Sequence, residues 1–307
     1  MTTPARWVLI STDVRLPRAQ TFSLAALCQV GDTISVLVGA AMVPEHAAEV
    51  TKEKQRTFET LGREYMDQRD ALMSRLFSDP GAGAEWLARA MAVISAFEIQ
   101  MNDRVVSSGV LSGASMHSIV HAARKVDFRQ ACIETLHRAS LSPNTRVAVL
   151  SANWSEEFIR ASLENPAHGV GLDVGRVELV ANSLEFKAAR TTGGMRLRRC
   201  QTPNDKERLL KGLLGGADLS VYVGDSVGDV PALLGAGVGI VMGRNALLGR
   251  VLERGGVDVC DLGRLLEEAG GGDAVAASAS AGRAGSRARR VLYQTDTWKD
   301  VRRILGV

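Results

Sequence analysis

The chain has 307 residues, with 37 Lys and Arg against 34 Asp and Glu, and a formal net charge of +3. Hydrophobic residues make up 46% and charged residues 23%, a balance typical of a globular protein with a packed core. The near-neutral charge argues against a nucleic-acid partner, because binding a phosphate backbone usually requires a concentrated basic face. The four cysteines lie far apart, which argues against a zinc site and a disulfide scaffold. No apolar run reaches the roughly 18 residues of a membrane span, so we expect no membrane partner and a cytoplasmic protein.

Three short apolar runs predict buried parallel strands, at 7–10, 147–150 and 219–223. Each run ends in small polar residues, and helical patterns follow the second and third, from Ser155 and from Val230. This alternation predicts an α/β fold with a Rossmann-like parallel sheet. The ligand site of such a sheet lies at the carboxyl ends of its strands.

Between the first two strands the pattern becomes helical. Residues 49–76 and 85–106 show apolar side chains at helical spacing, separated by a turn at Asp79-Pro80-Gly81. We therefore predict a helical cap over residues 21–124, inserted after the first strand, that excludes water and selects substrate. The α/β core would comprise residues 1–20, 125–268 and 290–307.

A low-complexity segment interrupts the core near its end. Residues 269–290 consist almost wholly of Gly, Ala, Ser and Arg, and their four Arg and one Asp account for the formal charge excess. Because such a segment buries too little apolar area to offset its ordering entropy, we predict a disordered linker. A strand-like pattern at 290–293 and an apolar helix at 298–305 follow.

Two carboxylates four residues apart follow the third strand. Gly224 and Asp225 end the strand and Asp229 comes one helical turn later, an arrangement that suits Mg²⁺, which prefers oxygen ligands. An Asx turn with a helix cap is the structural alternative.

A second group of residues could hold phosphate. Ser151 ends the second strand, and its hydroxyl, with the backbone N–H groups of Ala152 and Asn153, could bind a phosphate at a helix N-terminus. Lys206 lies just inside another predicted helix. Taken singly, an ordinary helix cap explains Ser151 and a surface position explains Lys206.

In this order, the Ser, the Lys and the Gly-Asp-x-x-x-Asp segment resemble the second, third and fourth motifs of the haloacid dehalogenase-like phosphatases. Residues 50–307 are similar in particular to the phosphatase half of the plant bifunctional thiamine monophosphate phosphatase/aminopyrimidine aminohydrolases. The matching segments are 102–113, 149–151 with Trp154, 180–182, 202–203 with Lys206, 221–229, 239–241 and 292–293 with Trp298.

The resemblance implies Mg²⁺-dependent hydrolysis of thiamine monophosphate or a similar small phosphorylated metabolite, through an aspartyl-phosphate. It implies that Ser151 and Lys206 hold the phosphoryl group. It further implies that Asp13, Asp225 and Asp229 hold Mg²⁺. Asn182, within the matching part, is a candidate to line the substrate site from a loop, with an ordinary turn Asn as the alternative.

The first motif departs from the Asp-x-Asp-x-Thr of these phosphatases, because Ser11-Thr12-Asp13-Val14-Arg15 offers one carboxylate instead of two. If Asp13 is the nucleophile, Arg15 takes the acid/base position, and Arg does not release its proton near neutral pH. If Asp13 is the acid/base, Ser11 takes the nucleophile position. Either alignment predicts a large loss of activity, since acid/base help is worth roughly 10²- to 10⁴-fold. A catalytically impaired protein that binds a ligand or a partner is therefore the alternative function, and a nucleotide or sugar phosphate the alternative substrate.

The predicted cap offers candidate contacts for the organic part of a substrate. Its aromatic residues could stack on a thiazolium or pyrimidine ring, and Glu98 or Asp103 could meet the positive charge of such a ring. Packing within a helical bundle explains the same residues equally well. The aromatic candidates are Phe58, Tyr65, Trp86 and Phe97.

Overall fold

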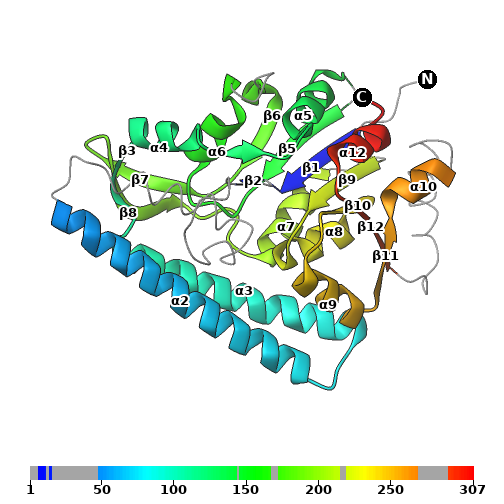
Figure 1. Ribbon diagram of the computed structural model, residues 1–307, viewed down its shortest axis with the longest axis horizontal. Helices are drawn as coiled ribbons and strands as arrows, with labels where there is room; N and C mark the ends of the chain where they lie inside the picture. The colour runs from blue at the N-terminus through cyan, green and yellow to red at the C-terminus, as the bar shows by residue number, and fades with distance from the viewer. Residues whose placement is uncertain are drawn as a thin grey trace.

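The computed structural model describes residues 6–11, 14–15, 48–143, 145–166, 172–214, 219–268 and 290–307. Its centre is a seven-stranded parallel sheet with the strand order β11-β12-β10-β9-β1-β5-β6 (Figure 1). The strands are β1 Arg6–Ser11, β5 Thr145–Leu150, β6 Val177–Val180, β9 Leu219–Gly224, β10 Val238–Met242, β11 Val257–Asp261 and β12 Arg290–Thr295. The predicted α/β class with a parallel sheet is confirmed, and the three predicted strands are the neighbours β9, β1 and β5 in its middle.

Helices cover both faces of the sheet, because alternate residues of each strand point to opposite faces. Val147 and Val149 of β5 join one apolar cluster with α4, α5, α6, α10 and α12, whereas Ala148 and Leu150 join another with α3, α7, α8 and α9. The helices have the following bounds: α4 Met116–Ala123, α5 Cys132–Leu141, α6 Glu156–Leu163, α7 Pro203–Leu214, α8 Val230–Gly235, α9 Ala246–Arg254, α10 Leu262–Glu268 and α12 Trp298–Leu305.

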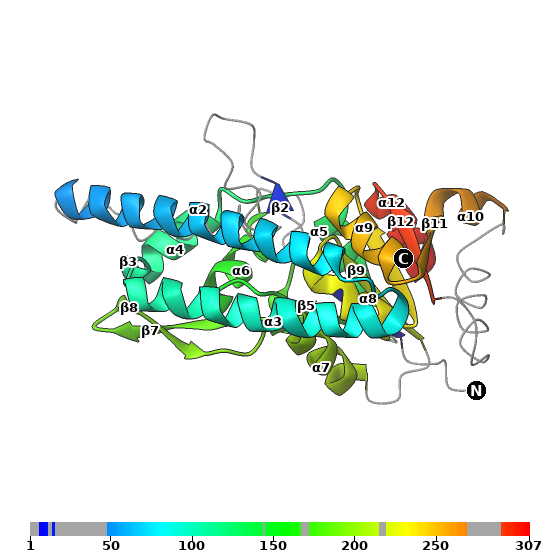
Figure 2. The ribbon, with the colours of Figure 1, turned by 90° about the horizontal axis from the view of Figure 1, so that it is seen from below.

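The two longest helices form a hairpin. Helix α2 spans Ala48–Ser78 and α3 spans Gly83–Ser108, as the apolar spacing predicted. They run side by side along the face that carries α7, α8 and α9 (Figures 1 and 2), and Trp86 is buried with its indole N–H donating to the Leu76 carbonyl. Helix α3 packs on α7 and α9, so the hairpin lies against the α/β core.

A small antiparallel sheet stands beside the core, in the order β3-β8-β7. Strand β3 is Ser112–Ser115, β7 is Ser183–Lys187 and β8 is Arg190–Leu197. The β7–β8 turn is made by Ala188 and Ala189, both with positive φ, 49° and 63°. The sequence does not reveal this hairpin, because its turn lacks the Asn-Gly or Asp-Gly pair that usually supplies such a conformation.

The domain division of the sequence analysis stays a prediction. Helix α4, which falls inside the predicted cap, packs against α6 on the flank of the sheet. Residues 16–47 of the predicted core and cap, and 269–289 of the predicted linker, lie outside the described residues. Among the helices that the structure describes, none is long and apolar enough to cross a membrane.

Candidate active site

Three of the predicted site residues meet at the carboxyl edge of the sheet. Ser151 directly follows β5, Asp225 directly follows β9, and Lys206 lies in the first turns of α7, whose helix packs against the loop after Asp225. Strand β1, between β5 and β9, ends at Ser11 on the same edge. Asp13 lies outside the described residues, so its role stays a prediction.

Asp229 is the centre of a buried hydrogen-bond network. Its Oδ1 accepts from Lys206 Nζ at 2.7 Å and from the Tyr222 hydroxyl at 2.9 Å. Its Oδ2 accepts from the Ser226 hydroxyl at 2.6 Å and from the backbone N–H groups of Ser226 and Asp225 at 3.1 and 3.2 Å. The lysine is 4% exposed and the aspartate 0%, so the ion pair is withdrawn from water.

The network keeps both partners charged. Burial opposes ionisation of Asp229, but the charge of Lys206 and the hydrogen bonds from Lys206, Ser226 and Tyr222 hold its pKa below the usual range. Burial likewise opposes the charge of Lys206, yet Asp229 raises the pKa of the lysine above its ordinary value. Lys206 is therefore a fixed ammonium at the strand ends.

Five donors on one carboxylate fill the acceptor capacity of Asp229, which has about four lone-pair sites. In this geometry Asp229 holds Lys206 and the loop after β9, and the metal-ligand role that the resemblance implied for it stays a prediction. Gly224 makes the close approach possible, because a Cβ there would lie 2.6 Å from the Asp229 Cβ.

Asp225 differs from its neighbour. It is 5% exposed, and burial together with the negative charge of Asp229 raises its pKa from 3.8 to about 7, against the opposing charges of Lys206 and Arg129. Its backbone carbonyl accepts from Asn245 Nδ2 at 3.3 Å. A buried carboxylate with a raised pKa is a group whose ionised form a divalent cation would stabilise.

Asn182 holds the loop that carries Ser151. Its Nδ2 donates to the carbonyls of Ala152, Asn153 and Cys200 at 3.1, 3.1 and 2.9 Å, and its Oδ1 accepts from the Cys200 N–H at 3.0 Å. Asn182 is fully buried. The predicted site residue thus clamps the backbone of the loop with its side chain.

Within this loop the Ser151 hydroxyl accepts from the Asn153 N–H at 3.1 Å. The Asn153 side chain in turn accepts from the Ser155 N–H at 2.9 Å, and Ser155 caps α6. These bonds fix the Ser151 side chain at the strand end. They also engage the Asn153 N–H, one of the donors that the sequence assigned to phosphate.

The hairpin of α2 and α3 contacts the loop that carries Ser151. Asn102 Oδ1 of α3 accepts from Trp154 Nε1, in the Ser151 loop, at 2.8 Å. One turn earlier Glu98 accepts from the Tyr65 hydroxyl at 2.8 Å. Asp103 pairs with Arg198, and all four aromatic candidates of the cap are at most 8% exposed, so helical packing occupies them.

Comparison with known proteins places this architecture. No family model matches the chain. The solved structure of cytosolic 5'-nucleotidase IIIB bound to cytidine superposes with a TM-score of 0.50 at 15% identity, covering 81% of this chain and 78% of that one. The chain has a haloacid dehalogenase-type fold. A phosphoserine phosphatase, solved as an analogue of its phospho-aspartyl intermediate, gives a TM-score of 0.47 at 16% identity, covering 81% of this chain and 91% of that one.

A curated relative agrees with the resemblance drawn from the motifs. The "Bifunctional TH2 protein, mitochondrial" of Arabidopsis thaliana is 29% identical over 259 residues, which are 76% of this chain and 41% of that protein. The chain therefore spans about two fifths of the length of that relative. Together with the fold, this match confirms the resemblance stated from the sequence.

The motif resemblance implies Mg²⁺, and the chemistry of Asp225 fits that ion. Its buried oxygens at the strand end are the ligand type that Mg²⁺ prefers, and the ion would offset the cost of ionising it. Among the described residues no group of three or more His, Cys, Asp and Glu is placed to hold a metal. A complete site would therefore need a ligand such as Asp13.

Two residues of the candidate site could not be recognised from the sequence. Tyr222 was assigned only to the apolar run of β9, although a buried tyrosine usually finds a partner for its hydroxyl. Arg129 follows the short strand β4 (Asp127–Phe128), which pairs with β2 (Val14–Arg15). The guanidinium of Arg129 lies 3.0 Å from where a Cβ on Gly243 would be, near the carboxyl end of β10, and its charge acts on Asp225.

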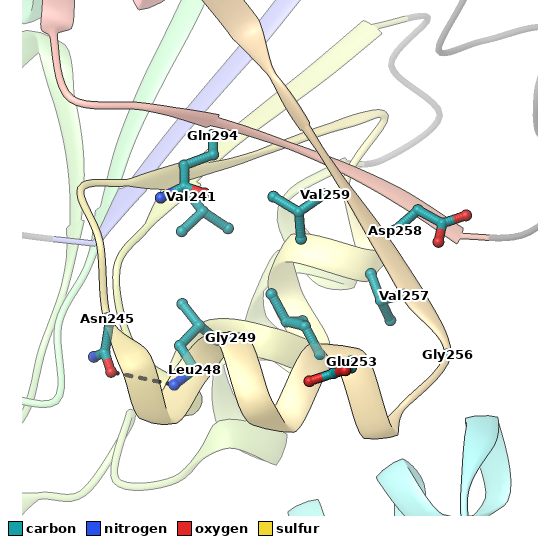
Figure 3. A pocket seen from close by; sticks show the side chains of 11 residues that line it. Val241, Asn245, Leu248, Gly249, Glu253, Gly256, Val257, Asp258, Val259 and Gln294 are labelled. Carbon is teal, nitrogen blue, oxygen red and sulfur yellow. Dashed lines mark hydrogen bonds between the residues drawn. The ribbon is translucent and has the colours of Figure 1, made fainter.

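A separate cavity of about 610 Å³ lies between α9 and β11, on the edge of the haloacid dehalogenase-type core (Figure 3). Val241, Leu248, Val257 and Val259 line it with apolar groups. Asn245 also lines the cavity, and its side chain caps α9 by accepting from the N–H groups of Leu247 and Leu248. Since the same side chain bonds to Asp225, the cavity adjoins the candidate active site.

Proposed function

We propose that the chain is a Mg²⁺-dependent phosphomonoester hydrolase that acts on a small phosphorylated metabolite, with thiamine monophosphate as the leading substrate. The observation that supports it most is the Lys206 ammonium, which is fixed by Asp229 and whose charge acts on the buried Asp225. A permanent cation next to a buried carboxylate that would hold Mg²⁺ suits the binding of a negatively charged phosphoryl group.

The residues of the candidate site have separate roles in this proposal. The Ser151 hydroxyl and Lys206 ammonium hold the phosphoryl oxygens, and Asp229 keeps the lysine charged and in place. Asp225, with Asp13, would hold Mg²⁺, which when bound neutralises charge on the phosphoryl oxygens. The nucleophile or acid/base role of Asp13 stays a prediction.

The choice of thiamine monophosphate rests on the motif resemblance and on the match to the Arabidopsis thaliana protein. The phosphate-holding residues do not discriminate between esters, because they contact only the group that all phosphomonoesters share. A nucleotide or a sugar phosphate is therefore the alternative substrate.

One observation favours a second function. The first motif offers one carboxylate, Asp13, where the phosphatases have two. A protein that binds a phosphorylated ligand without turning it over would keep Lys206 and Ser151 but would not need the missing acid/base.

The test is phosphate release by the purified chain from thiamine monophosphate, a nucleoside monophosphate and a sugar phosphate, with Mg²⁺ or with a chelator. We expect Mg²⁺-dependent release that is fastest for thiamine monophosphate and is abolished in Asp13→Asn and strongly reduced in Asp225→Asn. Thermal stabilisation by the esters without phosphate release would support the second function. A folded protein that neither binds nor hydrolyses any of them would refute both.

A further inference from the structure

A carboxylate on α3 is placed near the phosphate-holding end of the site without being part of it. Glu98 lies on α3, which packs on α7, the helix of Lys206. Its Oε1 accepts from the Tyr65 hydroxyl of α2 at 2.8 Å. The two long helices therefore hold this carboxylate in one position.

The neighbouring contact shows which way this part of α3 faces. Asn102, one turn after Glu98, bonds to Trp154 at 2.8 Å, and Trp154 lies three residues after Ser151. Residues four apart share a helix face. Glu98 and Asn102 thus line the boundary between the helical hairpin and the strand-end loops.

The charges around Glu98 agree with this placement. Burial is the largest influence on Glu98 and holds its pKa above the ordinary value, although the Tyr65 hydrogen bond and the positive charges of Arg69 and Lys206 act in the opposite direction. The phosphate-holding lysine is thus among the groups that act on this carboxylate. Lys206 is itself committed to Asp229 at 2.7 Å.

A carboxylate near the residues proposed to hold phosphate has a clear consequence for selectivity. It repels a substrate whose organic part is negative, and it attracts one whose organic part is positive, most strongly where water is excluded. We infer that Glu98, held by Tyr65, selects phosphomonoesters whose organic part carries a positive charge. This inference rests on the proposed hydrolase function and names the substrate class of that same site.

The experiment compares two esters and two matched variants. Thiamine monophosphate carries a cationic ring, whereas p-nitrophenyl phosphate carries none. In Glu98→Gln we expect kcat/KM for thiamine monophosphate to fall about tenfold or more, the range for a lost charged contact, with p-nitrophenyl phosphate unchanged or faster. Glu85→Gln, which alters an exposed carboxylate in the first turn of the same helix, should change neither.

Tyr65→Phe provides the second variant, because it removes the hydroxyl that holds Glu98 but keeps the charge. We expect a smaller loss of the same sign, about threefold for thiamine monophosphate, since the charge stays and only one hydrogen bond is lost. An equal loss for both esters in Glu98→Gln would overturn the inference. A wild-type preference for p-nitrophenyl phosphate, whose organic part is uncharged, would also overturn it.

Binding separates this inference from the proposed function. If the wild type hydrolyses neither ester, the proposed function fails, and calorimetric titration with free thiamine then decides the role of Glu98. Binding of thiamine that weakens about tenfold in Glu98→Gln but not in Glu85→Gln would uphold the cation site. Equal binding by all three proteins, or no binding, would overturn it.

Discussion

Two parts of the candidate site are built on opposite principles. One, the core wall, consists of Asp229, Lys206 and their hydrogen-bond partners, and the other is the wall formed by α2 and α3. On the core wall every oxygen of Asp229 is engaged, and Lys206 is fixed by a fully buried ion pair. On the wall formed by α2 and α3, one carboxylate, Glu98, is held by a hydrogen bond from Tyr65 among packed aromatic side chains. The saturated wall suits a group that never varies, the phosphoryl group. The sparser wall suits the part of the substrate that distinguishes one ester from another.

The most severe test of the core wall is Lys206→Met. It removes the phosphate-holding cation and leaves Asp229 buried without its partner, so we expect phosphate release to fall at least 10²-fold and the free energy of unfolding to fall by roughly 3–5 kcal/mol. Urea denaturation and initial rates measure the two effects. Adding Asp229→Asn should restore much of the stability and none of the activity. A double variant no more stable than the single one would contradict the charged pair.

Asp225→Asn should separate activity from stability on the same wall. We expect release of phosphate to fall by about 10²-fold or more, since the residue would hold Mg²⁺. Whereas activity falls in the variant, its free energy of unfolding at pH 8 should rise. Because the pKa of Asp225 is raised to about 7 when folded, its contribution is fully present below about pH 4 and is lost as the pH rises through 7.

The measurement is the unfolding free energy of wild type and variant between pH 4 and pH 8 without Mg²⁺. The wild type should lose stability over this range relative to Asp225→Asn, and the variant should be the more stable at pH 8. Mg²⁺ at pH 8 should stabilise the wild type alone. If the unfolding free energies of the two proteins changed in parallel with pH, burial would not suppress the ionisation of Asp225.

Tyr222→Phe asks how much of the core wall depends on one hydroxyl. It removes one of two donors on Asp229 Oδ1, so we expect about 1 kcal/mol less stability and roughly fivefold lower kcat, with both esters affected alike. The matched control is Tyr293→Phe, a buried tyrosine of β12 outside this network, which should leave kcat unchanged. A loss of kcat for thiamine monophosphate alone would contradict the assignment of Tyr222 to the wall that holds only the phosphoryl group.

The sequence could predict what depends on local pattern. The strands β1, β5 and β9 and the helices α2 and α3 follow from apolar spacing, and Lys206 and Asp225 follow from their positions after a helix start and a strand. The small antiparallel sheet escaped, because tertiary packing imposes the left-handed Ala188-Ala189 turn that local propensity disfavours.

The contacts between site residues could not be predicted, because they join residues that lie far apart in the sequence. Asn182 bonds to Cys200 and to the loop near residue 152, and Arg129 reaches Gly243, across 18 residues or more of chain. No periodicity records such contacts. The saturation of Asp229 likewise appears only once Tyr222, Lys206 and Ser226 are brought to the same carboxylate.

Asn102→Ala is expected to have the smallest effect and to sharpen the comparison most. It removes the acceptor for the Trp154 indole, the bond between the two walls, so stability should fall by about 1 kcal/mol. KM should rise about two- to threefold at nearly constant kcat, because the substrate must then order the hairpin against the Ser151 loop. Asn102→Asp keeps the acceptor and should restore stability, whereas a collapse of kcat in Asn102→Ala would mean that α3 belongs to the phosphate-holding wall.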